Sequence, residues 1–408
     1  MSSGTRQLHP DENIKLGKLG PHVFRIALTT GVLFLILTLV MGLLAGDDMT
    51  RFFFSYLVGF SFFLTLALGA LFFSTIQHLV RATWSVVVRR LTEAMMGTLP
   101  LMFGLSLVII IPMLLGHTGL YAWSDLAYAE DNYFVSQKLG YLNVPFFALR
   151  IIIYFAVWIA IAHYFLTRSV QQDQTGDTSI AARMRAVSAP AVIAFAITTN
   201  WAAYDIWMSL EPEWFSSIFG VYIFAGAMVA LFAALILVCM GLQKRGRLTR
   251  TITTEHYHDL GKFLFAFVFF WGYIAFSQYM LIWYANIPEE TIWYQMRIEG
   301  PWMYVTLALL FLHFAFPFTC LLSRHTKRRR STLAFFCAWL LVMHWIDLYW
   351  IILPTYDDGT IPFHLMDITA TLGIGGLFVA VAAHLLGRVD LVPTKDPGLG
   401  ESLEFENY

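Results

Sequence analysis

The chain has 408 residues, of which 58% are hydrophobic and 13% charged, and its formal net charge is −1. Because a soluble domain carries about 25% charged residues, this composition excludes an ordinary soluble domain and predicts a protein solvated by lipid. The net charge gives no indication of a nucleic-acid partner. The three cysteines lie in apolar runs without a CxxC motif, which argues against an iron–sulfur cluster on this chain.

The apolar residues form continuous runs that are long enough to cross a bilayer, for which a helix needs about 20 residues. In chain order these runs cover residues 23–45, 52–79, 94–117, 144–167, 187–210, 217–242, 260–283, 301–323, 331–354 and 365–387. The first run is too long for a signal peptide and lacks a clear cleavage site, so we interpret it as a true helix. Continuous rather than alternating runs exclude membrane strands. The sequence therefore predicts an all-α integral membrane protein with ten transmembrane helices.

The loops between these runs alternate in charge. Basic residues gather at 6–25, 81–90, 168–185, 244–262 and 324–330. The intervening loops are acidic and contain Asp47 and Asp48; Asp125, Glu130 and Asp131; Glu211 and Glu213; Glu289, Glu290 and Glu299; and Asp357 and Asp358. Cytoplasmic loops carry an excess of Lys and Arg, so this pattern predicts that both termini are cytoplasmic.

Two of the runs share a local pattern, which indicates an internal repeat. Asp205 precedes Pro212 by seven residues in "NWAAYDIWMSLEP", and Asp347 precedes Pro354 by seven in "HWIDLYWIILP". Coincidence is the alternative for so short a match. We predict two four-helix bundles at 52–210 and 211–354. Around them lie a cytoplasmic segment (1–22), a first flanking helix with its outer loop (23–51), an outer loop with a second flanking helix (355–388), and a cytoplasmic tail (389–408).

The two carboxylates are candidates for function because a charge inside a membrane helix is costly and persists when it has a partner in the bundle interior. Asp205 lies about five residues, or about 7–8 Å, from the outer end of its run. Arg150 lies at a similar depth in the preceding run and is its candidate partner. A purely structural ion pair between the two helices is the open alternative. We predict that Asp205→Asn lowers coupling or turnover and leaves assembly intact.

Histidines add to this set because an imidazole titrates near neutrality and suits proton relay. The candidates for a proton pathway are Asp205, Asp347, Arg150, His163, His313 and His344. A hydrogen-bonded structural role is the alternative for each histidine. Glu211, Glu213 and Trp214 lie at the outer boundary, where charge and tryptophan are common, and we interpret them as a partner-docking rim. At the inner boundary, Arg89 and Arg90 lie one turn from Glu93, and Asp259 lies one turn from Lys262. These residues can form ion pairs at helical spacing, and a solvated rim is the favoured alternative.

Two cofactor classes are disfavoured by spacing. A b-type haem requires two axial ligands, often paired histidines, and no pair of runs repeats a two-histidine spacing. No P-loop or GxGxxG motif follows a strand, which disfavours nucleotide chemistry. We expect no metal, no catalytic residue and no cofactor held by this chain.

Three long blocks resemble a known family. "STIQHLVRATWSVVVRRLTE" (74–93), "NWAAYDIWMSLEPEWFSSIFGVYIFAG" (200–226) and "HDLGKFLFAFVFFWGYIAFSQYMLIWYANIPEE" (258–290) resemble the NrfD-like membrane subunits of bacterial alternative complex III, most of all the ActF type. The chain is more distantly similar to the polysulfide reductase membrane subunit. The core of that subunit is two four-helix bundles. Among the candidates for a proton pathway, only Asp205 lies inside these blocks.

The resemblance implies a subunit of a quinol-oxidising respiratory complex in the bacterial inner membrane. The implied partners are a multihaem c-type cytochrome, an iron–sulfur protein, a paralogous NrfD-like subunit that is the better candidate for quinol oxidation, a monohaem cytochrome c, small membrane subunits and lipids. Haem c and the iron–sulfur clusters would lie on those partners. Quinone, of the menaquinone class first of all, is the ligand that this chain could contact, and a proton route is the other implied role.

Two other function classes stay open at the level of sequence. A secondary transporter could use the same repeat and buried charges, although transporter repeats often place interrupted helices at the midplane. Pro212 and Pro354 lie at helix ends and interrupt no run. A passive scaffold is the third alternative, which would be favoured if no internal carboxylate mattered.

Overall fold

The computed structural model describes residues 7–117, 119–357 and 359–407, and this part of the chain contains helices and no strand. Ten helices in it are long and apolar enough to cross a membrane. The prediction of an all-α chain with ten helices able to cross a membrane is therefore confirmed for the described residues. Asp358, one of the predicted acidic loop residues, lies outside the described residues.

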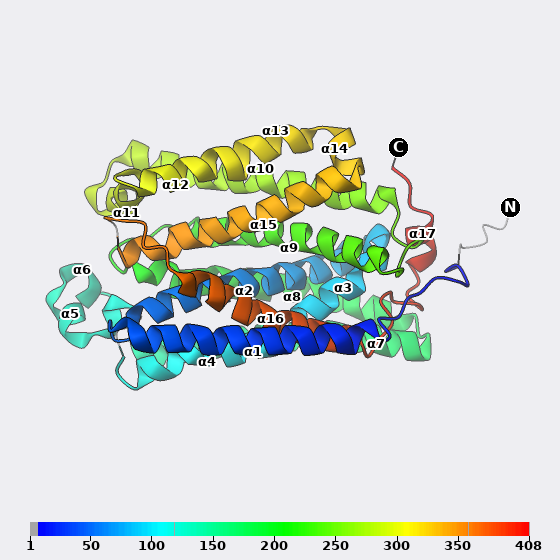
Figure 1. Cartoon of the computed structure of the whole chain (residues 1–408), viewed down its shortest axis with the longest axis horizontal. Coiled ribbons are helices and arrows are strands. Elements are labelled where there is room, and N and C mark those ends of the chain that lie inside the picture. Colours follow the sequence, from blue (N-terminus) through cyan, green and yellow to red (C-terminus); the bar gives the residue numbers. More distant parts are fainter. Residues whose placement is uncertain (1–6, 118, 358, 408) are drawn as a thin grey trace.

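The ten membrane-spanning segments follow the predicted runs and extend several of them. They are α1 (Leu19–Ala45), α2 (Thr50–Leu79), η1–α3–α4 (Thr83–Ser85, Val86–Met96 and Leu99–Leu114), α7 (Val144–Thr175), α8–η3 (Ser179–Ile206 and Met208–Leu210), α9 (Phe219–Lys244), α10 (Thr254–Ala285), α12–η4–α13 (Trp302–Ala308, Leu309–Ala315 and Phe316–Leu322), α15–η5 (Arg330–Ile352 and Leu353–Thr355) and α16 (Leu365–Leu386). The helices lie roughly side by side along one axis (Figure 1).

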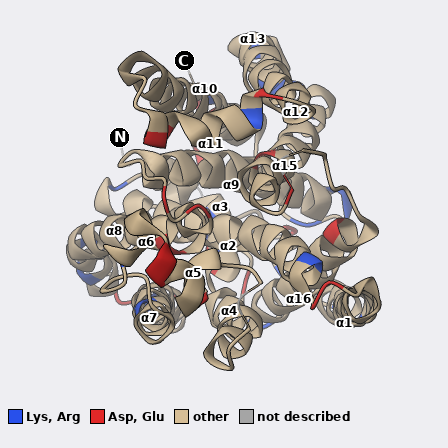
Figure 2. Ribbon diagram, turned by 90° about the vertical axis from the view of Figure 1, so that its left-hand side faces the viewer, with Lys and Arg blue, Asp and Glu red and all other residues tan. Residues whose placement is uncertain are grey.

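Helix α2 is the centre of the bundle. It packs against α16, α9, α3, α8, α15 and α4, and the end-on view places it among them (Figure 2). In the most apolar 18-residue stretch of α2, 89% of the residues are buried, whereas in that of α1 only 22% are buried. A helix that is apolar on all sides and buried fits such a central position, and polar side chains on α2 therefore meet protein rather than lipid.

Helices α1 and α16 form a close pair at one edge of the bundle (Figure 2). A Cβ atom on Gly376 would lie 2.5 Å from the Cα atom of Gly31, and one on Gly373 would lie 2.7 Å from Leu35. Small residues let membrane helices approach this closely. A larger side chain at Gly31 or Gly376 would separate the pair.

The short elements divide the two ends of the bundle. The end that we call the acidic end carries α5 (Leu126–Asp131), α6 (Tyr133–Ser136) and α11 (Pro288–Ile298). The opposite, basic end carries both termini, α14 (Arg324–Arg328) and α17 (Leu399–Leu403) (Figure 1). The predicted acidic and basic loops thus lie at opposite ends.

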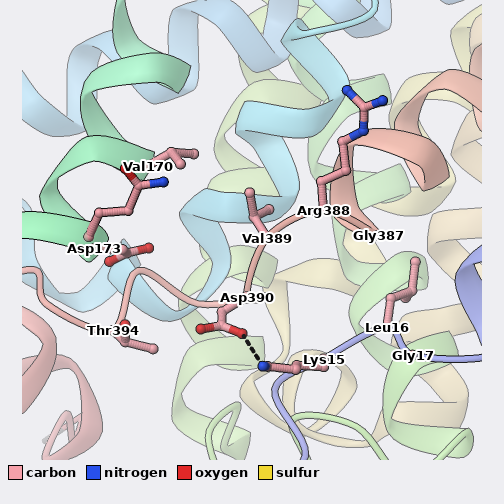
Figure 3. Close-up of a pocket in the computed structure, with 11 residues that line it drawn as sticks. Lys15, Leu16, Gly17, Val170, Asp173, Gly387, Arg388, Val389, Asp390 and Thr394 are labelled. Atoms are coloured by element: carbon pink, nitrogen blue, oxygen red, sulfur yellow. Dashed lines mark ion pairs between the residues drawn. The ribbon is translucent and has the colours of Figure 1, made fainter.

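The described parts of the two terminal segments, which the sequence predicts to be cytoplasmic, pack onto the basic end. Leu391 and Val392 are fully buried, and the Leu391 amide donates to the carbonyl of Ile14 at 2.7 Å. Beside them lies an open depression of about 410 Å³, where Lys15 and Asp390 approach to 4.0 Å (Figure 3). Burial of these apolar side chains therefore attaches the two terminal segments to the bundle.

The third span differs most from its predicted limits. It begins at Thr83 rather than near residue 94, and α3 therefore includes Arg89, Arg90 and Glu93. All three side chains are buried, so the prediction of a solvated rim is wrong for them. The three valines at 86–88 are buried with them and pack α3 against the surrounding helices. Ion pairs compensate the buried charges.

The eighth span contains an irregularity that the sequence analysis did not predict. Residues Leu309–Ala315 form one turn of π-helix between α12 and α13, and His313 lies within it. Such π-bulges are rare and are frequent at functional sites. The extra residue in the turn changes the direction in which His313 points.

Candidate functional site: two buried carboxylates

Asp205 on α8 is fully buried and bound by three side chains. Nε and Nη2 of Arg150 donate to its two oxygens at 2.8 and 2.9 Å. The hydroxyls of Tyr154 and Tyr141 donate to the same oxygens at 2.7 and 2.9 Å. This bidentate geometry is the strong form of a carboxylate–guanidinium pair. The predicted partner of Asp205 is the one that the structure places there.

The local sequence explains this arrangement. Arg150 and Tyr154 lie one turn apart on α7, so both reach across to α8. The guanidinium carbon of Arg150 lies 3.8 Å from the ring centre of Tyr141, and Nη1 donates to the Tyr141 carbonyl at 2.8 Å. Burial first, and then the negative charge of Asp205, raise the pKa of the Tyr141 hydroxyl above its usual value. Tyr141 therefore stays a donor.

Asp347 on α15 is equally buried but is bound only by neutral groups. The Tyr222 hydroxyl on α9 donates to Oδ1 in a short hydrogen bond, and Nε1 of Trp271 on α10 donates to Oδ2 at 3.1 Å. In the part of the chain that the structure describes, no nitrogen of Lys, Arg or His lies within 4.0 Å of its oxygens. No cation therefore offsets a negative charge on this carboxylate.

Two histidines share the surroundings of Asp347. His344 precedes it by three residues on α15, and Nε2 of His344 lies 3.0 Å from the Thr65 hydroxyl of α2. His313 stacks on Trp271 with ring centres 4.0 Å apart. Nδ1 of His344 and both ring nitrogens of His313 are buried without a hydrogen-bond partner among the described residues. Buried polar atoms are normally paired, so this cluster departs from ordinary packing.

The two sites therefore differ in chemistry although both carboxylates lie near the acidic end of their spans. Asp205 forms an ion pair with Arg150, and each of its two oxygens accepts two hydrogen bonds. Asp347, His344 and His313 form a group of titratable side chains that are held by Trp271, Tyr222 and Thr65. A carboxyl group and imidazoles at such a position can hold or pass a proton.

From this cluster toward the basic end, the side chains of α2 are apolar for more than two turns. The residues from Leu66 to Phe73 carry no polar side chain, a length of about 12 Å at 1.5 Å per residue. The next polar side chain on α2, Ser74, contacts Thr92 on α3 at 3.0 Å. Along α2, the Asp347 cluster is thus separated from the polar residues of the basic end.

Those basic-end residues form a second, ionic cluster. Arg90 pairs with Glu93 at 3.2 Å and with Asp173 of α7 in a short contact. Arg89 forms a short contact with Asp396 of the C-terminal segment. The cluster thereby joins α3, α7 and the tail, and its cations and carboxylates compensate each other.

The remaining predicted residues lie apart from these sites. The side chain of His163 is exposed on the surface of α7, away from both carboxylates. Glu213 is exposed and accepts from Asn132 at 2.6 Å, and Glu211 is half-buried. Trp214, a predicted docking residue, is buried and stacks on Trp293 with ring centres 4.5 Å apart, so its ring is not presented at the surface. Its ring fills the core beneath α11.

Sequence reasoning missed several residues of the sites. Tyr222, Trp271 and Thr65 lie in apolar runs where nothing distinguishes them from packing residues. Arg297 on α11 was also missed, although an arginine within an amphipathic outer segment is a visible signal. Its guanidinium is fully buried and donates to the carbonyls of Trp350 and Ile351, at 3.2 and 2.9 Å. Burial lowers the pKa of Arg297 to about 10.

The described residues contain no group of three or more His, Cys, Asp or Glu side chains that could hold a metal ion. No protein-family model matches the chain, and no curated protein sequence matches it.

Proposed function

We propose that this chain is a membrane subunit of a quinol-oxidising respiratory complex of the alternative complex III type, in the bacterial inner membrane. Its ten helices would be two four-helix bundles with α1 and α16 as flanking helices, and both termini would be cytoplasmic. The resemblance of residues 74–93, 200–226 and 258–290 to NrfD-like subunits suggests the complex. Helix α9 packs against α10 and α15, and α7 packs against α4 and α8, which is compatible with the two bundles; α9 also contacts α2 and α8.

The observation that best supports a chemical role is the environment of Asp347. A buried carboxyl group with two neutral donors and two neighbouring histidines is unexpected in a passive scaffold, because a charge in the membrane interior is costly. In our proposal Asp347, His344 and His313 hold a proton during turnover. Asp205 and Arg150 fix α7 to α8.

Electron transfer is assigned to the partners. Quinol, of the menaquinone class first of all, would be oxidised mainly at the paralogous NrfD-like subunit, and electrons would pass to iron–sulfur clusters and haems c on other subunits. This chain would contribute the membrane arm and the proton site. The acidic end, with the exposed Glu213, would face the periplasmic partners.

The experiment that tests this function is purification of the native assembly in mild detergent, with subunit mass spectrometry and a reduced-minus-oxidised haem spectrum. We expect co-purification with a multihaem c-type cytochrome, a monohaem cytochrome c and an iron–sulfur protein. Isolation of the chain alone and without haem, from membranes in which other complexes stay intact, would contradict the proposal. That result would favour a secondary transporter instead.

A further inference from the structure

A groove on the lateral surface of the bundle is not part of either carboxylate site. It lies between α1 and α16, with Phe63 of α2 and Arg245, just beyond the end of α9, in its wall. Its volume is about 500 Å³. Helices α1 and α16 lie at the edge of the bundle (Figure 2), and exposed lining residues such as Ile26 and Val379 place the groove on the lateral surface.

The groove has the shape of a channel for a hydrocarbon chain. Along α1 its lining runs from Leu19 to Thr30, a rise of eleven residues or about 16 Å. Ile26 on α1 and Val379 on α16 form its exposed apolar sides, with 55% and 44% of their surfaces accessible. Gly375 and Gly376 line it without side chains. Gly376, which lets α16 approach α1, and Gly375, where a Cβ atom would meet Phe63 of α2, therefore also leave the groove open.

The charge of the groove is confined to its basic end. His22 and Arg245 are its only titratable lining residues, and no carboxylate lines it. Arg245 is exposed, and its guanidinium forms no hydrogen bond or ion pair with the described part of the chain. An arginine at this level of a membrane protein reaches toward the lipid headgroups.

We infer that this groove binds an anionic phospholipid of the leaflet at the basic end. The phosphate would lie against Arg245 and His22, and one acyl chain would lie along Ile26, Val379 and the two glycines. Burial of apolar surface would hold the acyl chain, while Arg245 would select a negatively charged headgroup. Basic pockets between helices on the positively charged side of membrane proteins recognise anionic lipids in this way. This inference is independent of the respiratory role proposed above.

The test is native mass spectrometry of the purified protein titrated with phosphatidylglycerol or with phosphatidylcholine of the same chain lengths. We expect tighter retention of phosphatidylglycerol. Arg245→Gln should weaken it about fivefold, the usual effect of one basic residue near an anionic headgroup. Lys244→Gln is the matched control, because it removes the neighbouring charge but does not line this groove.

A second pair of variants tests the place of the acyl chain. Val379→Trp on α16 fills the groove and should reduce the retention of both lipids. Leu33→Trp adds the same ring to an exposed position of α1 outside the groove and should leave retention unchanged. Equal retention of the two lipids, or equal effects of Arg245→Gln and Lys244→Gln, would overturn the inference. Displacement of the bound lipid by a neutral quinone at equimolar concentration would overturn it as well.

Discussion

Arg150 on α7 donates two hydrogen bonds to Asp205 on α8, at 2.8 and 2.9 Å. Asp347, the counterpart of Asp205 in the sequence repeat, has no cation within 4.0 Å among the described residues. Two carboxylates with the same spacing to a proline thus have different surroundings. An ion pair closed by two tyrosines is suited to holding helices together. A carboxyl group between Tyr222, Trp271 and His344 is suited to exchanging a proton.

The first prediction concerns the stability of the Arg150–Asp205 pair. Removing one member of a buried pair leaves the other charge uncompensated and costs about 3–5 kcal/mol. We expect Arg150→Met to lower the thermal midpoint of the purified protein sharply. The double variant Arg150→Met with Asp205→Leu leaves no charge and should recover most of the loss. A double variant that is no more stable than Arg150→Met would contradict the pair as the cause.

The second prediction concerns pH and Tyr141. Its raised pKa means that the folded protein binds the phenolic proton more tightly than the unfolded chain. The resulting stability is fully present below the usual tyrosine pKa of about 10 and is lost as the pH rises through the higher folded value. We expect wild type to be more stable than Tyr141→Phe at pH 8. The difference between their thermal midpoints should shrink between pH 10 and pH 12.

The third prediction approaches the Asp347 cluster without changing a titratable group. A Cβ atom on Gly226 would lie 3.1 Å from the His344 ring and 3.7 Å from an Asp347 oxygen. We therefore expect Gly226→Ala to displace the imidazole and to lower turnover of the assembled complex. Gly241→Ala on the same helix meets nothing within 4 Å and is the control. If the two variants turn over equally fast, His344 has no part in the reaction.

The fourth prediction concerns the C-terminal segment. Asp396 contacts Arg89, and Leu391 and Val392 are buried against the bundle. We expect Asp396→Asn to release the segment in part and to make it several-fold more sensitive to limited proteolysis. Glu401→Gln removes an exposed carboxylate of the same segment and should not. Equal cleavage of both variants and wild type would show that the apolar contacts alone hold the tail.

Composition and loop charge predicted the helices well because both follow from the cost of placing polar groups in lipid. The same reasoning failed for Arg89, Arg90 and Glu93, since three charges near the end of an apolar run look identical whether water or other charges compensate them. The bend at α3–α4 and the π-turn at His313 depend on packing between helices. Gly97 after α3, Pro100 in the first turn of α4 and Pro317 after the π-helical turn are local signals that the sequence analysis did not use.

Within the candidate site, the pairing of Asp205 with Arg150 could be predicted because both charges had to lie at one depth and find a partner. The contrast with Asp347 could not, because it depends on which residues of α9 and α10 face α15. Tyr222 and Trp271 are two among many aromatic residues in those helices. His163 shows the converse limit, since depth alone does not tell which side of a helix faces the bundle.

The contacts of Asp205 change what we expect of Asp205→Asn, for which the sequence predicted lost turnover with intact assembly. Four donated hydrogen bonds and an ion pair now favour the structural alternative. An asparagine leaves Arg150 without a counter-charge, so the amount of assembled complex should fall. The rate per assembled complex should stay normal.

The most direct test of the account compares Asp347→Asn with Asp205→Asn in membranes, with the quinol-oxidation rate and proton release both expressed per assembled complex. The amide oxygen of asparagine can accept the hydrogen bond of Trp271, and its N–H can donate to the Tyr222 hydroxyl, but the side chain cannot bind and release a proton. We predict that Asp347→Asn assembles normally and loses at least about tenfold in rate or in proton release. Full rate and full proton release in Asp347→Asn would contradict a proton site at Asp347.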